Sequence, residues 1–340
     1  MCWCLTGATR ILTGMRLLVL GGTRFVGRAV VVDALARGWD VWALHRGLSG
    51  ALPVGATPLL ADRAAPGELV RAVGEHSWDL VVDTWDGAPR VATEAAQLLS
   101  GRARRYAYVS SMSVYAWGSH VDEGSPLVGG DALAQAGEYP ALKRGAELGV
   151  LTGHPDALLV RAGLILGPHE DIGRLPWWLD RIARGGQVVA PGRPDRPLQY
   201  VDARDLATWL LSALLNSLAG PVDVASRSGH ATTKQLLEAC INSTRSSARL
   251  MWVDEADLLA MGAEPFTQIP CWVPEAGEFA GFLEADTSLA ATTGLVCRPI
   301  TETVDDTWRW IKQEGMPAQR PDRDVHGLPI ELEQQILASQ

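Results

Sequence analysis

Short apolar runs alternate with amphipathic segments from Met15 onward, and this pattern is typical of a parallel sheet covered by helices. Five runs are predicted to be strands: RLLVL from Arg16, DVWALH from Asp40, DLVVD from Asp79, RYAYVS from Arg105 and ALLVRAG from Ala157. Helical spacing is predicted over residues 26–37 and 91–99. Gly38 and Gly101 follow these segments, where glycine favours the end of a helix.

The pattern changes after about Gly167, where Pro-, Gly- and Trp-rich loops are mixed with helical segments. The helical segments begin at Ala203 and Thr233, and a final amphipathic helix is predicted after Gly327. The fold class expected is α/β, a Rossmann-type doubly wound parallel sheet with a smaller C-terminal substrate domain. We expect residues 1–14 to be a disordered leader, residues 15–167 with a returning part at about 197–230 to form the core, and residues 168–340 to form mainly the substrate domain.

Composition and charge narrow the range of functions. The 340 residues are 47% hydrophobic and 20% charged, as in globular proteins, and the net charge of −9 comes without any basic run, which argues against nucleic acid as a partner. The sequence has no apolar run of membrane-spanning length and no signal-peptide pattern. Five scattered cysteines indicate a reducing compartment, and no spacing of cysteine or histidine predicts a metal site. We therefore expect a cytoplasmic protein.

A glycine-rich turn follows the first predicted strand and leads into a helix. A strand, a tight turn and a helix N-terminus together form a site for a pyrophosphate. Arg24 occupies the place of the middle glycine of the usual GxxGxxG pattern, and its guanidinium could pair with a phosphate oxygen. The predicted dinucleotide-binding residues of the turn are Gly21, Gly22, Thr23, Arg24, Phe25, Val26 and Gly27.

The end of the second predicted strand bears on the choice of dinucleotide. An acidic residue there takes the ribose hydroxyls of NAD, whereas an arginine accommodates the 2′-phosphate of NADP. This strand ends without an acid and is followed by Arg46, which favours NADP over NAD, although a solvated arginine at a strand end is the plainer alternative. Asp62 is expected to accept from the adenine amino group or to be a plain loop carboxylate, and Thr84 is placed at the cofactor.

Two further segments predict catalytic chemistry. YPALK places Tyr139 and Lys143 four residues apart on one helix face, where the cation favours the phenolate and lowers the pKa of Tyr139. VSSMSVYA closes the strand that begins near Arg105, at the edge of the sheet where ligands bind, and brings Ser111 and Ser113 to that edge.

These motifs resemble those of the extended short-chain dehydrogenases, in which SSxxVYG precedes a YxxxK helix, and the resemblance spans Met15 to about Trp310. It implies that Tyr139 is the acid/base and that Lys143 holds the nicotinamide ribose while tuning Tyr139. It also implies that Ser111 binds the reacting oxygen and that Ser113 touches the substrate.

Two departures from the family pattern limit the prediction. Met112 and Ser113 replace the Asp-Glu pair of the sugar 4,6-dehydratases. In the segment that resembles RDYIHVxDLA, Asp205 matches the family aspartate, but Leu198 stands where sugar-nucleotide epimerases carry an arginine that binds pyrophosphate. Nearby Arg193 or Arg196 could replace that arginine in space.

The sequence predicts an NADP(H)-dependent oxidoreductase that transfers a hydride to or from a carbonyl or alcohol of a small molecule. Sugar or sugar-nucleotide epimerisation or dehydration is one alternative. A non-catalytic nucleotide sensor or an RNA binder, similar to the chloroplast stem-loop RNA-binding proteins, is another. Trp85 is predicted to bind substrate, Trp177 and Trp178 are further candidates for an aromatic pocket, and a homodimer is expected.

Overall fold

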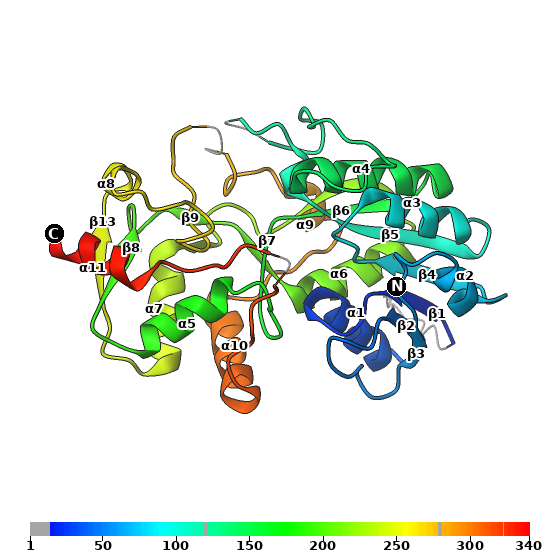
Figure 1. Cartoon of the computed structure of the whole chain (residues 1–340), viewed down its shortest axis with the longest axis horizontal. Helices are drawn as coiled ribbons and strands as arrows, with labels where there is room; N and C mark the ends of the chain where they lie inside the picture. The colour runs from blue at the N-terminus through cyan, green and yellow to red at the C-terminus, as the bar shows by residue number, and fades with distance from the viewer. Residues whose placement is uncertain (1–13, 119–120, 278–280, 322) are drawn as a thin grey trace, which may run out of the picture.

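The structure is a computed structural model that describes residues 14–118, 121–277, 281–321 and 323–340. The predicted disordered leader lies, apart from Gly14, outside the described residues. A parallel sheet of seven strands in the order β11-β6-β5-β4-β1-β2-β3 forms the larger lobe (Figure 1). Its strands are β1 Arg16–Leu20, β2 Asp40–His45, β3 Thr57–Leu60, β4 Trp78–Asp83, β5 Ala103–Ser111, β6 Leu158–Ala162 and β11 Gly220–Val224.

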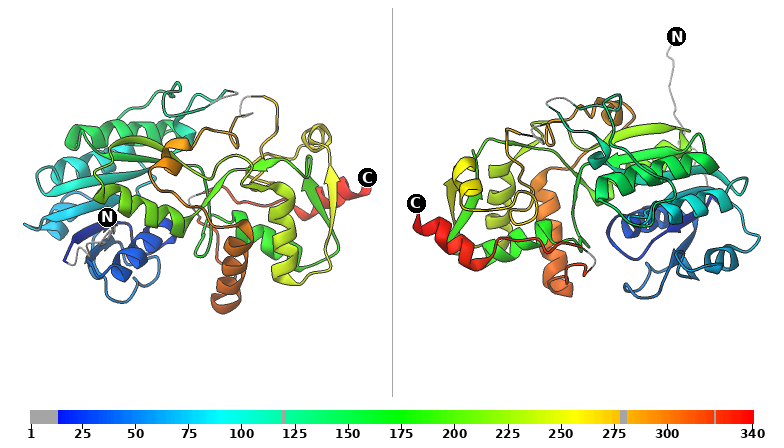
Figure 2. Two further views of the ribbon diagram at one scale, coloured as in Figure 1. Left: turned by 180° about the vertical axis from the view of Figure 1, so that it is seen from behind. Right: turned by 45° about the horizontal axis from the view of Figure 1, so that its top comes forward.

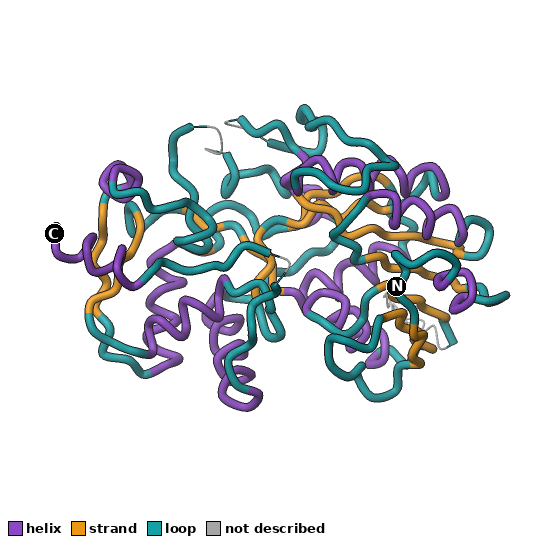
Figure 3. Tube along the Cα trace, in the orientation of Figure 1, coloured by secondary structure: helices purple, strands orange, loops and turns teal. Residues whose placement is uncertain are grey.

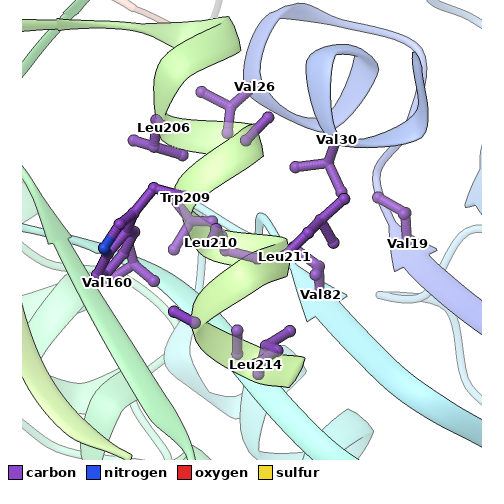
Figure 4. Packing of buried hydrophobic residues seen from close by; sticks show 14 of the residues in the cluster. Val19, Val26, Val30, Val82, Val160, Leu206, Trp209, Leu210, Leu211 and Leu214 are labelled. Atoms are coloured by element: carbon purple, nitrogen blue, oxygen red, sulfur yellow. The ribbon is translucent and has the colours of Figure 1, made fainter. Parts of the chain in front are cut away.

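Helices cover both faces of the sheet, as the continuous apolar strands require. The helices of this lobe are α1 Phe25–Ala36, α2 Glu68–Val73, α3 Pro89–Leu98, α4 Tyr139–Gly153 and α6 Ala203–Leu215, with a short 3-10 turn, η1, at Met112–Val114. Successive residues of β1 alternate between the two faces. Leu17 and Val19 pack in a core with α1 and α6 (Figure 4), whereas Leu18 and Leu20 pack in a second core with α3 and α4.

The chain order reverses between β1 and β4, which are neighbours in the sheet. In a doubly wound sheet, ligands bind beyond the carboxyl ends of the strands at such a switch point. The residues that end β1, β4 and β5 are Leu20, Asp83 and Ser111. The topology thus brings the glycine-rich turn and the serine motif to one edge.

The smaller lobe is built from helices and two-stranded sheets around its own apolar core (Figures 1 and 3). Its helices are α5 Arg174–Ala183, α7 Thr233–Thr244, α8 Glu255–Ala260, α10 Ile300–Glu314 and α11 Ile330–Ala338, and α9 Ser288–Thr292 packs instead on the larger lobe beside β11. The remaining strands pair as β7 Leu164–Leu166 with β10 Tyr200–Asp202, β9 Pro197–Leu198 with β12 Ala231–Thr232, and β8 Gln187–Pro191 with β13 Arg249–Val253.

Buried carboxylates at the start of α6 tie the two lobes together. Asp202 caps α6 by accepting from the Arg204 backbone NH at 2.9 Å, and it also accepts from the Thr303 hydroxyl of α10 at 2.9 Å. Asp205 accepts from the backbone NH and the guanidinium of Arg298, at 2.8 and 2.6 Å. The aspartate that matches the family segment therefore has a structural partner in the other lobe.

The fold class predicted from the sequence is confirmed: a Rossmann-type parallel sheet is followed by a C-terminal region. The predicted helix starts at Ala203 and Thr233 are those of α6 and α7. The edge strand β3 was not predicted, because three of its four residues are exposed and it lacks the continuous apolar run of a buried strand.

The packing of α6 against α1 generates a stability prediction. Leu210 is fully buried in that core (Figure 4), so Leu210→Ala should lower the free energy of unfolding by about 2 to 5 kcal/mol through lost burial and the cavity left behind. Leu133→Ala, at a position that is 64% exposed, is the matched control and should cost less than about 0.5 kcal/mol. Urea unfolding followed by circular dichroism measures both; equal losses would contradict the assigned packing.

Candidate active site

A cavity of about 490 Å3 lies at the carboxyl edge of the sheet, beside the glycine-rich turn. It also receives residues from α4, α5 and the chain beyond α10. The residues that the sequence predicted at the glycine-rich turn, at the strand ends and in the catalytic motifs all line it except Gly22. Those that line it are Gly21, Thr23, Arg24, Phe25, Val26, Gly27, Arg46, Asp62, Thr84, Trp85, Ser111, Ser113, Tyr139 and Lys143.

Close packing explains the glycines of the turn. A Cβ at Gly27 would lie 1.7 Å from the Gly21 carbonyl oxygen, so no side chain fits there. Gly22 faces the other way, because a Cβ on it would lie 2.8 Å from the Cβ of Ala43 in β2. Gly22 therefore serves the packing of the turn on the sheet rather than the lining of the cavity.

The N-terminus of α1 is open to an anion. Its first turn has no acidic residue, and Arg24 at the N-cap makes no side-chain cap. The backbone NH groups of such a terminus and the helix dipole favour negative charge. The Arg24 guanidinium, expected at a phosphate, instead donates to Asp171 Oδ2 at 3.0 Å, which anchors the turn to the loop before α5.

Arg46 and Asp62 line the cavity, and both also line a second cavity of about 290 Å3. The Asp62 backbone NH donates to Glu68 Oε2 at 2.7 Å, and its carboxylate accepts from the Ala64 NH at 3.0 Å. These bonds fix the loop after β3. The two side chains predicted to bind the adenosine half thus lie together at the ends of β2 and β3.

A buried ion pair that the sequence analysis missed shapes the middle of the cavity. Asp83, at the end of β4, accepts from both terminal nitrogens of Arg63 at 2.6 and 2.7 Å. It also accepts from the Tyr106 hydroxyl at 2.8 Å and the Trp85 NH at 2.9 Å. The Arg63 guanidinium stacks 5.1 Å from the Trp85 ring. Asp83 thereby holds Arg63 and Trp85 in the wall.

The three predicted catalytic side chains converge at the end of β5. Tyr139 is the first residue of α4, directly before Pro140, and Lys143 follows one turn later. The Ser111 hydroxyl accepts from the Ser113 NH at 3.1 Å and donates to the Ser113 hydroxyl at 3.0 Å. Tyr139 lines the same cavity as Ser111 and Ser113.

Lys143 is 2% exposed, and two backbone carbonyls hold its ammonium. Its Nζ donates to Trp85 O at 2.9 Å and to Val109 O at 2.7 Å, and it lies 4.3 Å from the centre of the Tyr108 ring. Burial lowers the pKa of Lys143 to about 8, because the charged form is desolvated. The cation is therefore directed at the ends of β4 and β5.

The pKa of Tyr139 departs from the sequence prediction. Burial, followed by the Asp86 carboxylate, raises the pKa of Tyr139 above the usual value for a phenol, although Ser111 and Arg323 act in the opposite direction. The prediction that Lys143 lowers the pKa of Tyr139 was wrong, because desolvation of the phenolate outweighs the effect of the nearby cations.

Charged residues outside the predicted motifs complete the site. Asp86 Oδ2 forms ion pairs with Arg320 at 2.7 Å and with Arg323 at 2.8 Å. Burial opposes the shift, but the two arginines with Lys143 hold the pKa of Asp86 below its usual value. Asp86 lies three residues beyond β4, a position that the strand pattern could have indicated. The arginines come from a Pro-rich segment without a recognisable motif.

The substrate end is partly aromatic, but not through the tryptophans predicted in the second half of the chain. Phe266 and Phe282 line the cavity, with ring centres 5.5 Å apart. Trp178 is instead buried in the core of the smaller lobe, where its Nε1 donates to Pro270 O at 2.7 Å, and Trp177 packs against that core.

The predicted substitutes for the pyrophosphate-binding arginine do not line the cavity. Leu198 is fully buried in β9. Arg196 is 4% exposed and donates to Glu284 at 2.5 Å, while Arg193 pairs with Glu275 and Asp195. Carboxylates of the smaller lobe thus engage both arginines.

Among the residues that the structure describes, no helix is long and apolar enough to cross a membrane. No group of three or more His, Cys, Asp or Glu side chains in that part of the chain is placed to hold a metal ion.

Comparison with known structures gives the same fold in several bacterial and archaeal proteins. The enzyme WbmH of Bordetella bronchiseptica in complex with NAD+ matches with a TM-score of 0.69 and 16% identity, over 89% of this chain and 99% of that chain. A putative epimerase of Burkholderia cenocepacia matches with a TM-score of 0.68 and 18% identity, over 88% and 98%. The UDP-N-acetylglucosamine 4-epimerase of Methanobrevibacter ruminantium matches with a TM-score of 0.68 and 17% identity, over 89% and 100%.

The curated proteins contain no significant match to the chain. The sequence profile of the NAD dependent epimerase/dehydratase family, by contrast, matches residues 17–225, which include the glycine-rich turn, the serine motif and the YxxxK helix. This match confirms the predicted family and enzyme class. The chain belongs to the NAD dependent epimerase/dehydratase family.

Proposed function

We propose that this protein transfers a hydride between a nicotinamide dinucleotide and an oxygen-bearing carbon of a small molecule, with Tyr139 as acid/base. One observation carries the proposal: Ser111, Tyr139 and Lys143 meet in the cavity that also contains the glycine-rich turn. The family and the NAD+-bound WbmH structure support the choice of cofactor class.

The cavity suits a dinucleotide. The open N-terminus of α1 would take the pyrophosphate, Asp62 and Arg46 the adenosine half, and Lys143 the second ribose. The guanidinium groups of Arg63 and Arg174 also line the cavity, each paired with a buried carboxylate. A nicotinamide bound beside Tyr139 would supply the hydride donor or acceptor.

Tyr139 would hold the proton that balances hydride transfer. Because burial raises its pKa, the phenol is protonated at neutral pH and can donate to the oxygen of a carbonyl. Ser111, which lines the cavity together with Tyr139, would orient the same oxygen. Lys143 lies one turn along α4 and would hold the ribose while its charge stabilises the phenolate that is left when the proton is donated.

We propose net oxidation or reduction with NADP(H) as the reaction. The cavity lining does not include Leu198, Arg193 or Arg196, so none of them supplies the arginine with which sugar-nucleotide epimerases bind pyrophosphate. The acid pair of the dehydratases is replaced by Met112 and Ser113. Epimerisation through a transient ketone is the second candidate. The family and its fold neighbours, among them a UDP-N-acetylglucosamine 4-epimerase, favour it.

One experiment separates these two reactions. The purified protein is incubated with NADPH and a panel of carbonyl compounds, and in parallel with UDP-sugars. Stoichiometric loss of the 340 nm absorbance with one carbonyl compound supports net reduction. Conversion of a UDP-sugar to its epimer without net change in cofactor supports the second candidate and rejects the first.

Tyr139→Phe tests the proposed acid/base. Phenylalanine keeps the ring and its packing and removes only the transferable proton, so turnover should fall about 10²-fold or more while cofactor binding stays nearly intact. Lys143→Met should weaken cofactor binding as well. Steady-state kinetics and cofactor titration by fluorescence measure the two effects, and undiminished turnover by Tyr139→Phe would reject the assignment.

Arg46 tests the preference for NADP. The wild-type protein should bind NADPH more tightly than NADH, and Arg46→Ala should reduce the difference by about 1 to 3 kcal/mol through loss of a charge-assisted contact. Arg71→Ala, on α2 and with a side chain 73% exposed, is the control and should leave the difference unchanged. Calorimetric titration with each cofactor is the measurement, and equal wild-type affinities would contradict the preference.

Lys143 gives cofactor binding a predicted pH dependence. Its pKa of about 8 means that the ammonium is present below pH 8 and is lost as the pH rises through that value. Cofactor affinity should therefore fall above pH 8, because a neutral amine holds the ribose less strongly. Lys143→Met should bind weakly and without this dependence. A wild-type affinity that is constant from pH 7 to pH 9 would exclude the proposed role of the charge.

Cytoplasmic location, a homodimer and the domain boundaries given by the sequence stay predictions. Gel filtration with light scattering measures the oligomeric state. Limited proteolysis tests whether cleavage falls near residue 167.

A further inference from the structure

The chain between α10 and α11 contributes Arg320, Arg323, Asp324 and His326 to the cavity lining, and we call residues 316–321 and 323–329 the C-terminal segment. It runs beside the junction of the two lobes before it reaches α11 (Figures 1 and 2). The Arg320 NH donates to Asp171 O at 3.1 Å, and the Gly327 NH donates to Thr267 O at 2.9 Å. The segment is thus attached at both ends to residues that line the cavity.

Arg323 of this segment lies over the ring of Tyr139. Its guanidinium carbon is 5.1 Å from the ring centre. Asp86 fixes this position, because one terminal nitrogen of Arg323 lies 2.8 Å from the Asp86 carboxylate and donates to the Asp86 carbonyl at 3.2 Å. The side chain is 26% exposed, so water screens the guanidinium only in part.

The charges around Tyr139 come from several elements. Asp86, beyond β4, raises the pKa of Tyr139, whereas Ser111 of β5, Arg323 and then Arg174 of α5 lower it. Lys143 on the same helix directs its ammonium to the carbonyls of Trp85 and Val109. Among these side chains, Arg323 is the cation stacked on the phenol ring.

We propose that Arg323 is a positioning residue that acts through Tyr139, holding the ring in place and stabilising its phenolate when the proton leaves. This inference rests on the proposed acid/base role of Tyr139. Arg323 belongs to the smaller lobe and lies outside the YxxxK motif. The C-terminal segment therefore contributes a side chain that positions Tyr139.

A direct titration of residue 139 tests the effect without any activity measurement. A difluorotyrosine is placed at position 139 of the full chain, which makes the phenol more acidic, and its 19F chemical shift is followed against pH. Arg323→Met should raise the titration midpoint by about one pH unit, as expected for loss of a partly screened charge near 5 Å. Arg323→Lys should restore part of the shift.

Arg320→Met is the matched control, because Arg320 pairs with the same Asp86 oxygen while Arg323 stacks on the phenol. It should move the midpoint by less than half as much as Arg323→Met. Equal shifts in the two variants, or no shift in Arg323→Met, would overturn the proposal. Circular dichroism and urea unfolding of each variant show whether the fold is kept.

The pH dependence of turnover provides the second readout. In Arg323→Met, the limb of the pH–rate profile that is assigned to Tyr139 should move to higher pH by the same amount as the 19F midpoint. Arg323→Lys should place this limb between those of the wild type and of Arg323→Met. A shifted 19F midpoint with an unshifted pH profile, together with an active Tyr139→Phe variant, would reject the acid/base role and keep the electrostatic contact. An unshifted 19F midpoint with an inactive Tyr139→Phe variant would reject the role of Arg323 alone.

Discussion

The contact between Gly27 and the carbonyl of Gly21 determines where the rest of the site lies. With no room for a Cβ, α1 lies directly against the end of β1, and its first NH groups stand at the sheet edge. The switch in strand order between β1 and β4 opens the crevice beside them. Each other element contributes by reaching this crevice: β5 with Ser111, α4 with Tyr139 and Lys143, and the C-terminal segment with its arginines.

Polar groups buried in the wall make the cavity rigid at an energetic cost. Asp83 and Arg63 are almost completely removed from water, and their ion pair offsets the desolvation cost of burying each charge. The same carboxylate accepts hydrogen bonds from the Tyr106 hydroxyl and the Trp85 backbone NH. Two carbonyls hold Lys143 in the same way. The fold thus spends stability on a fixed arrangement of charges, as binding sites commonly do.

The sequence predicted most of the larger lobe because its signals are local. The strand runs, the glycine-rich turn and the YxxxK spacing each lie within a few residues, so period and turn chemistry suffice to recognise them. The pairing of Arg24 with Asp171 and the stacking of Arg323 on Tyr139 join residues more than 140 positions apart, and no local pattern encodes them. The predicted direction of the Tyr139 pKa shift was wrong for a related reason. The i,i+4 spacing indicates that Lys143 is near, but burial and the Asp86 carboxylate act on Tyr139 only in the folded chain.

The C-terminal segment is synthesised after all other parts of the cavity lining. Every residue that lines the cavity from outside this segment precedes Arg320 along the chain, so the sheet and α4 can fold on the ribosome before the segment emerges. A nascent chain at that stage has the glycine-rich turn, Tyr139 and Lys143 but lacks the guanidinium over the phenol. A chain whose synthesis stops before Arg320 therefore lacks the C-terminal part of the cavity lining.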